Sequence, residues 1–243
     1  MTLSGEDLRN MQMHVAADKE LQHESWKIFQ VMAEFVEGFD KMSNIHPAVS
    51  FFGSARIERR DPYYDLARNT AKLLSESGFS IISGGGPGIM EAVNRGAQEG
   101  GSPSVGLNIK LPGRTEEAND YLDVSIKFHN FFVRKLMFVQ YASAYIVMPG
   151  GLGTLDEVIE CLTLMQTDKA HRIPVILVGR GFWNGLVDWF EHTLLKHATI
   201  EKSDLEMFQV LDRPEEIRDA VFDFYQGSGF RRLEQRHKIP IQL

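Results

Sequence analysis

Short, largely apolar runs alternate with longer segments of helical periodicity along most of this chain. Each run has the length and composition of a buried strand, and the segments between them repeat apolar residues every three or four positions. Buried strands separated by helices favour a parallel sheet that is covered on both faces and wound right-handedly. The pattern therefore predicts a doubly wound, mostly parallel Rossmann-like α/β fold. The expected strands are residues 48–52, 79–83, 104–109, 124–128, 142–147 and 174–178.

The expected helices divide the chain into three parts. Residues 17–42 carry apolar side chains at near-helical spacing with charges between them, which predicts an amphipathic helix. We expect an N-terminal helical arm over residues 1–46, a Rossmann-like domain over 47–226 and a charged C-terminal tail over 227–243. Within the domain, the expected helices are residues 63–77, 89–97, 132–141, 155–166 and 214–225, with a further one containing Trp183 and Phe190.

The composition excludes several classes of protein. With 243 residues, 43% of them hydrophobic and 24% charged, the chain is long enough for one large core. Its net charge of −7 argues against binding to a nucleic-acid backbone, which usually requires a basic stripe. No apolar run approaches the roughly 20 residues of a membrane span, and no signal-peptide pattern begins the chain. The single cysteine, Cys161, fits a small core residue, so we expect a cytoplasmic protein whose partners include neither nucleic acid nor membrane.

Three glycine-rich turns follow expected strands, at Gly53-Ser54, at Gly84 to Gly88 and at Gly150 to Thr154. In a doubly wound sheet the carboxyl ends of the strands lie at the edge where ligands bind. Glycine permits positive φ angles and close approach of a ligand to the backbone, while a helix N-terminus favours an anion. None of the turns has the P-loop pattern, and the first lacks the dinucleotide fingerprint. We therefore expect a smaller phosphorylated ligand rather than ATP or NAD.

Two charged positions near these turns each allow a structural and a functional interpretation. Thr154 and Glu157 fit the S/T-x-x-E capping box, in which both side chains satisfy backbone donors at a helix start. The pair Arg134-Lys135 fits either a solvated basic pair or an anion-binding guanidinium. Its apolar neighbours Phe131 and Phe132 make simple exposure less favourable. The residues alone leave both alternatives open.

Three motifs occur in order with the expected strands and helices between them. They are Gly84-Gly85-Gly86-Pro87-Gly88-Ile89-Met90-Glu91-Ala92, then Arg134-Lys135, then Pro149 to Glu157, which reads PGGLGTLDE. Together they resemble the LONELY GUY family, whose members are often mislabelled lysine decarboxylases. The last motif matches the family signature PGGxGTxxE at every specified position. The resemblance covers roughly residues 47–195, and segments such as Phe128 to Phe132 look more like the longer bacterial branch than the short plant-type proteins.

The resemblance implies a phosphoribohydrolase that cuts the N-glycosidic bond of a nucleoside 5′-monophosphate, releasing free base and ribose 5-phosphate. The family's catalytic arginine falls on Arg134 and its catalytic glutamate on Glu157, and neither a cofactor nor a metal is expected. Breaking this bond builds positive charge on the sugar, which a carboxylate can stabilise. Further substrate or phosphate contacts are expected at Gly53, Ser54, Gly85, Gly86, Met90, Lys135, Gly150, Gly151, Leu152, Gly153, Thr154, Asp156 and Thr163.

Several finer features stay open. An additional acidic contact falls on either Glu116 or Glu117, because the segment around them differs in length from the branch pattern. The substrate is expected to be a cytokinin riboside monophosphate, an AMP-like purine nucleotide, or both. The resemblance also implies a homodimer or a larger assembly of dimers, with residues 47–226 as the nucleotide-binding catalytic domain.

Other functions fit the sequence less well. The main alternative is a binding protein that holds a phosphorylated ligand without cleaving it, as a molybdenum-cofactor carrier does. The presence of both Arg134 and Glu157 in their family contexts favours the enzyme. Single-strand nucleic-acid binding requires a basic and aromatic stripe, which this acidic chain lacks. Lysine decarboxylation requires a Schiff-base lysine in a pyridoxal site, and the usual decarboxylase motif does not occur.

Overall fold

A computed structural model describes residues 26–111 and 117–228 of the chain. The chain divides into two compact units, Met1–Asp40 and Lys41–Leu243. A helix runs over residues 26–42, so the second half of the expected N-terminal helix is present. Residues 17–25 of that helix, and the expected tail beyond residue 228, lie outside the described residues.

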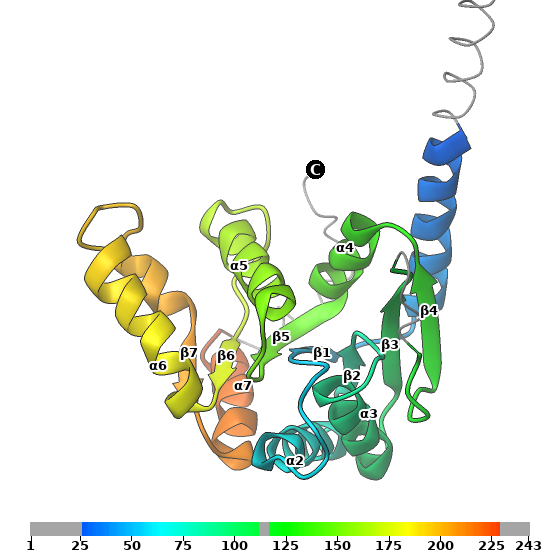
Figure 1. Cartoon of the computed structure of the whole chain (residues 1–243), viewed down its shortest axis with the longest axis horizontal. Coiled ribbons are helices and arrows are strands. Elements are labelled where there is room, and N and C mark those ends of the chain that lie inside the picture. Colours follow the sequence, from blue (N-terminus) through cyan, green and yellow to red (C-terminus); the bar gives the residue numbers. More distant parts are fainter. Residues whose placement is uncertain (1–25, 112–116, 229–243) are drawn as a thin grey trace, which may run out of the picture. The chain divides into compact units, whose positions relative to one another are not determined.

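The second unit is built on a seven-stranded parallel sheet with the strand order β4-β3-β2-β1-β5-β6-β7 (Figure 1). The doubly wound parallel fold predicted from the sequence is confirmed, and each expected strand is present. A seventh strand was not expected, because its three residues are partly exposed and form no apolar run. The strands are β1 (Ala48–Phe52), β2 (Ser80–Ser83), β3 (Ser104–Ile109), β4 (Val124–Phe128), β5 (Ala142–Val147), β6 (Val175–Val178) and β7 (Gln209–Leu211).

Helices cover both faces of this sheet. Figure 1 shows α2, α3 and α7 on one face and α4, α5 and α6 on the other. Among the described helices, none combines the length and the hydropathy that a membrane crossing needs. The helices are α2 (Pro62–Glu76), α3 (Ile89–Gly100), α4 (Phe131–Tyr141), α5 (Leu152–Gln166), α6 (Arg180–Trp189) and α7 (Pro214–Ser228), with a π-helical turn at Phe190–Leu194 and a 3₁₀ helix at Lys202–Met207.

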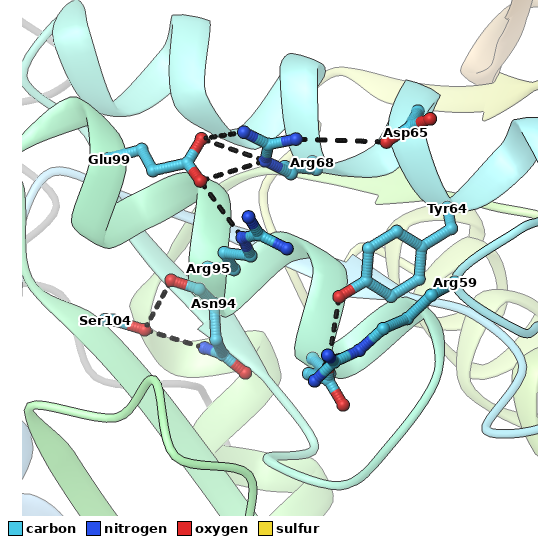
Figure 2. Close-up of polar contacts among 9 residues, drawn as sticks. Arg59, Tyr64, Asp65, Arg68, Asn94, Arg95, Glu99 and Ser104 are labelled. Atoms are coloured by element: carbon cyan, nitrogen blue, oxygen red, sulfur yellow. Dashed lines mark hydrogen bonds and ion pairs between the residues drawn. The ribbon is translucent and has the colours of Figure 1, made fainter.

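One hydrophobic core cluster lies between the sheet and the layer formed by α2, α3 and α7. Fully buried side chains from all three helices meet those of the central strands, and each contributes about 1.5–3 kcal/mol relative to exposure. At the surface of this layer, Glu99 of α3 accepts hydrogen bonds from Arg68 of α2 and from Arg95 (Figure 2). Cys161 is buried on α5, as expected for a core residue, and burial raises the pKa of its thiol.

The direction of winding reverses between β1 and β5, which are parallel neighbours in the sheet. From β1 the chain proceeds outward through β2 to β4, and from β5 it proceeds the other way through β6 and β7. At such a reversal the loops after the two central strands separate and leave a crevice at the carboxyl edge, where ligands bind in open α/β sheets. In this sheet the two loops follow Phe52 of β1 and Val147 of β5.

Candidate active site

A cavity of about 640 Å³ opens at this reversal point. It is lined by the loop after β1, the first two turns of α5, one side of α4, one residue of α3, and two residues at and just after the end of β3. The described residues that line it are Gly53, Ser54, Ala55, Arg56, Met90, Ile109, Leu111, Phe131, Arg134, Lys135, Gly151, Leu152, Gly153, Thr154, Asp156 and Glu157.

Backbone hydrogen bonds connect the three glycine-rich turns. The Ser54 N–H donates to the carbonyl of Pro149 at 3.1 Å, and the Ile89 N–H donates to the carbonyl of Ser54 at 3.0 Å. Gly88 has a φ of +69°, and a Cβ there would lie 2.6 Å from the Ser54 carbonyl oxygen, so this turn requires glycine. The first turn is therefore held between the other two.

Helix α5 begins earlier than its periodicity predicts. Its first residue is Leu152, its N-cap is Gly151, and no side chain caps it. Thr154 and Glu157 are then the third and sixth residues of the helix, so the capping-box interpretation of this pair is wrong. The Leu155 N–H already donates to the Gly151 carbonyl at 3.0 Å.

The first turn of α5 offers backbone donors to the cavity. The amides of Leu152, Gly153 and Thr154 precede Leu155, whose N–H is the first intrahelical donor, and so have no partner within the helix. Leu152 and Gly153 are exposed, whereas the Thr154 side chain is buried against Gly150, where a Cβ would collide with its hydroxyl. Such a turn, with the positive end of the helix dipole, is an anion-binding element.

Arg134 of α4 and Glu157 of α5 face each other in the cavity. Nη2 of Arg134 lies 3.7 Å from Oε1 of Glu157. The guanidinium also lies 5.3 Å from the ring centroid of Phe138, and a Cβ on Gly84 would lie 2.6 Å from its Nη2. Arg134 is 8% exposed, and its Nε has no hydrogen-bond partner among the described residues. A buried donor of this kind is costly unless a ligand or water accepts from it.

Burial raises the pKa of Glu157 to about 7, although the nearby charge of Arg134 acts in the opposite direction. Its side chain is 19% exposed, on the wall of the cavity. A carboxylate whose pKa lies near neutrality can accept a proton from a reacting group and still ionise at physiological pH. Burial therefore gives Glu157 a pKa in the range suited to proton transfer.

Lys135 has a different environment from its neighbour. Its Nζ lies 2.8 Å from Asp156 and 3.0 Å from Glu160, so it connects α4 to α5. Burial alone would lower the pKa of Lys135, but the hydrogen bonds to Asp156 and Glu160 outweigh it and raise the pKa. The charge of Lys135 is thus already matched by carboxylates.

The structure brings most of the expected site residues together, but not all. Gly85, Gly86, Gly150 and Thr163 do not line the cavity. The carbonyls of Gly85 and Gly86 accept hydrogen bonds from Asn119 instead. The Thr163 hydroxyl donates to the carbonyl of Ile159 within α5, because threonine in a helix can bond to the preceding turn.

Of the two open acidic positions, Glu116 lies outside the described residues. Glu117 is exposed and does not line the cavity.

Sequence reasoning missed several residues of the cavity wall, namely Ala55, Arg56, Ile109, Leu111 and Phe131. Arg56 carried a usable signal, since it follows the first glycine turn directly and adds a charge at the ligand edge. Ile109 and Leu111 gave a weaker indication, because they lie at and just after the end of β3, at the same edge of the sheet. Asp188, Glu191 and His192 could hold a metal ion, but all three are exposed and none lines the cavity.

Comparison with known proteins identifies relatives of this chain. A family model described as "Possible lysine decarboxylase" matches residues 90–221, more than half of the chain. A protein of Oryza sativa subsp. japonica, named probable cytokinin riboside 5′-monophosphate phosphoribohydrolase, is 28% identical over 175 residues, covering 72% of this chain and 82% of its own. A cytokinin riboside 5′-monophosphate phosphoribohydrolase of Mycobacterium tuberculosis is 29% identical over 159 residues, covering 65% and 82%.

Solved structures share the fold at lower identity. The molybdenum cofactor carrier protein of Chlamydomonas reinhardtii aligns with a TM-score of 0.54 and 20% identity, over 74% of this chain and 98% of its own. The molybdenum cofactor binding protein of Rippkaea orientalis aligns with a TM-score of 0.50 and 21% identity, over 74% and 94%. At these identities the likeness concerns the fold alone.

Proposed function

Because the chain belongs to the LONELY GUY family, whose model is described as "Possible lysine decarboxylase", we propose that it is a nucleoside 5′-monophosphate phosphoribohydrolase. It cleaves the N-glycosidic bond and releases free base and ribose 5-phosphate. Its substrate is a cytokinin riboside monophosphate, an AMP-like purine nucleotide, or both. Relatives from rice and Mycobacterium tuberculosis carry the name of this activity.

The observation that carries the proposal is the placement of three chemical elements around one cavity. The first turn of α5 supplies an anion site, and Glu157 supplies a carboxylate with a pKa of about 7. Arg134 supplies a buried guanidinium whose Nε has no hydrogen-bond partner in the part of the chain that the structure describes. A nucleoside 5′-monophosphate offers a matching set, namely a phosphate, a sugar carbon that becomes cationic, and sugar hydroxyls. These elements lie on rigid helices, which favours reaction by fixing the groups in register.

The reaction assigns one role to each element. The first-turn amides of α5 bind the 5′-phosphate, and Arg134 holds oxygens of the ribose phosphate through its planar donors. As the C1′–N bond breaks, its electron pair leaves with the base, and the carboxylate of Glu157 stabilises the cationic sugar. Water then adds to C1′, while Glu157 accepts its proton and the base takes up a proton.

The family description as a lysine decarboxylase does not fit the lysine of this cavity. A pyridoxal enzyme requires an unprotonated lysine amine that can form a Schiff base. The salt bridges of Lys135 with Asp156 and Glu160 raise its pKa and keep the amine charged. We therefore assign Lys135 to the joining of α4 and α5.

The proposal is tested by incubating the purified protein with AMP, GMP, CMP, UMP and a cytokinin riboside monophosphate. Free base and ribose 5-phosphate should appear in at least one reaction, and Glu157→Gln should retain the fold but release none. Glutamine keeps the size of the side chain and loses its negative charge. Release of no base from any of the five would instead favour a protein that holds a phosphorylated ligand without cleaving it.

We further propose that the chain assembles as a homodimer through the surface around the cavity. Phe131 and Leu152 line the cavity yet remain 50% and 85% exposed, and the neighbouring Phe132 is 55% exposed. Large apolar side chains gathered at one place typically mark an interface. Light scattering should give twice the chain mass, and Phe132→Asp together with Leu152→Asp should reduce it to the monomer.

A further inference from the structure

Arg56 differs from the other cations of the cavity in having no carboxylate partner within residues 26–111 and 117–228. Arg134 faces Glu157, and Lys135 contacts Asp156. Within each of these two pairs the positive and negative charges cancel. Among the described residues that line the cavity, Arg56 therefore leaves a net positive charge. An unpaired arginine that lines the same cavity as a helix N-terminus suits an anionic ligand group.

The backbone that carries Arg56 is fixed on both sides. Its own N–H donates to the hydroxyl of Ser54 at 3.0 Å, and Ser54 is bonded to both other glycine turns. Three residues later, Arg59 donates to Glu91 of α3 at 2.8 Å, and Tyr64, drawn beside Arg59 in Figure 2, donates to the same carboxylate oxygen. The exposed guanidinium of Arg56 therefore extends from a rigid base and needs little backbone rearrangement to bind a ligand.

We propose that Arg56 binds the 5′-phosphate of the substrate together with the first-turn amides of α5, and so makes the site selective for phosphomonoesters over uncharged nucleosides. The inference rests on the proposed function. A helix N-terminus supplies the equivalent of about half an elementary charge, whereas a phosphomonoester carries about −1.5 to −2 at pH 7. The planar donor fork of arginine supplies a full charge and can bind two phosphate oxygens at once.

Binding of ribose 5-phosphate, measured by calorimetry, tests the inference without relying on hydrolysis. Arg56→Gln should weaken binding about 10- to 100-fold, the range typical of a lost hydrogen bond between charged groups. The affinity of Arg56→Lys should fall between those of the wild type and Arg56→Gln, because lysine keeps the positive charge and loses the planar pair of donors. Arg60→Gln is the matched control, since Arg60 lies in the same loop, pairs with Glu58 and does not line the cavity. It should bind as the wild type does.

Kinetics separate this inference from the proposed function. On the best nucleotide substrate, Arg56→Gln should raise KM by a similar factor while kcat changes much less, and activity on the matching nucleoside should stay the same. Hydrolysis by the wild type with an unchanged KM in Arg56→Gln would overturn the role of Arg56 and leave the function standing. Ribose 5-phosphate binding that depends on Arg56, without hydrolysis of any nucleotide, would overturn the proposed function and leave phosphate binding by Arg56 standing. If the wild type binds no ribose 5-phosphate and releases no base from any nucleotide, both are wrong.

Discussion

The guanidinium of Arg134 lies 3.7 Å from the carboxylate of Glu157, close enough for electrostatic attraction but too far for a hydrogen bond. Each group therefore stabilises the charge of the other without occupying its hydrogen-bonding atoms. The Nε of Arg134 has no hydrogen-bond partner among the described residues, and Glu157 lines the cavity. Because the two groups do not hydrogen-bond to each other, both can bind sugar oxygens or a water molecule that lies between them.

The pH dependence of the reaction should follow the ionisation of Glu157. Its pKa of about 7 means that the carboxylate, which the proposed reaction requires, is the minor form below neutrality. We expect kcat/KM to fall about tenfold per pH unit below pH 7 and to level off above it. Because the substrate phosphate ionises near pH 6, the pKa of Glu157 should also be measured directly by NMR of the carboxyl carbon. A value near 4.5 would contradict the assignment.

The same raised pKa predicts how Glu157 affects stability. Between pH 4.5 and 7 the folded protein holds a proton on Glu157 that the unfolded chain has released, so the free energy of unfolding falls as pH rises. Glu157→Gln avoids this loss and should be more stable than the wild type at pH 8, by about 1–3 kcal/mol. Thermal unfolding at pH 4 and pH 8 should show the difference at pH 8 alone. An equal gain in stability of Glu157→Gln at pH 4 and pH 8 would exclude the ionisation of Glu157 as the cause.

Removal of the Arg134 charge should affect both chemistry and ionisation. Arg134→Gln should lower kcat/KM about 100- to 1,000-fold, as for loss of one preorganised donor at a reacting centre. It should also raise the pKa of Glu157 further, because Arg134 now lowers it. Carboxyl-carbon NMR of the variant measures this shift.

The neighbouring variant Lys135→Gln is the control for Arg134→Gln. Its ion pairs with Asp156 and Glu160 lie at the edge of the cavity. Such pairs contribute little to the free energy of unfolding, about 0–1 kcal/mol. We expect a change in kcat/KM of less than about tenfold. An effect as large as that of Arg134→Gln would mean that Lys135 also binds the substrate.

The sheet could be predicted from the sequence because buried parallel strands are largely apolar, as in β1, where Ser50 is the one polar residue among five buried ones. The start of α5 could not. Gly151 and Gly153 disfavour helix by propensity, so the periodic pattern becomes visible only at Leu155, three residues after the helix begins. That delay made Thr154 look like an N-cap and Glu157 like its partner. Tertiary contacts, not local propensity, fix the first turn.

The cavity wall was predictable where one motif supplies several neighbours, as Gly151 to Glu157 do. It was less predictable where separate loops meet, because Arg56 and Leu111 become neighbours of that motif only through the sheet order. Glycine content alone does not locate the cavity wall. Gly85 and Gly86 were expected to contact the ligand; they do not line the cavity, and their carbonyls accept hydrogen bonds from Asn119. Sequence shows that a turn is glycine-rich and not which side of it faces the ligand.

A pair of glycine substitutions tests whether the first turn of α5 binds the phosphate. A Cβ on Gly153 would meet no atom within 4 Å, and the same is true of Gly185 on α6. Both positions are exposed and helical, so alanine at either should leave stability unchanged or raise it by up to about 1 kcal/mol. Gly153 lines the cavity and Gly185 does not. A methyl group at Gly153 would stand where the phosphate approaches the amides, so Gly153→Ala should raise KM for the nucleotide at least tenfold, whereas Gly185→Ala should leave it unchanged. If Gly153→Ala is as active as Gly185→Ala while both are equally stable, the phosphate does not bind at this turn.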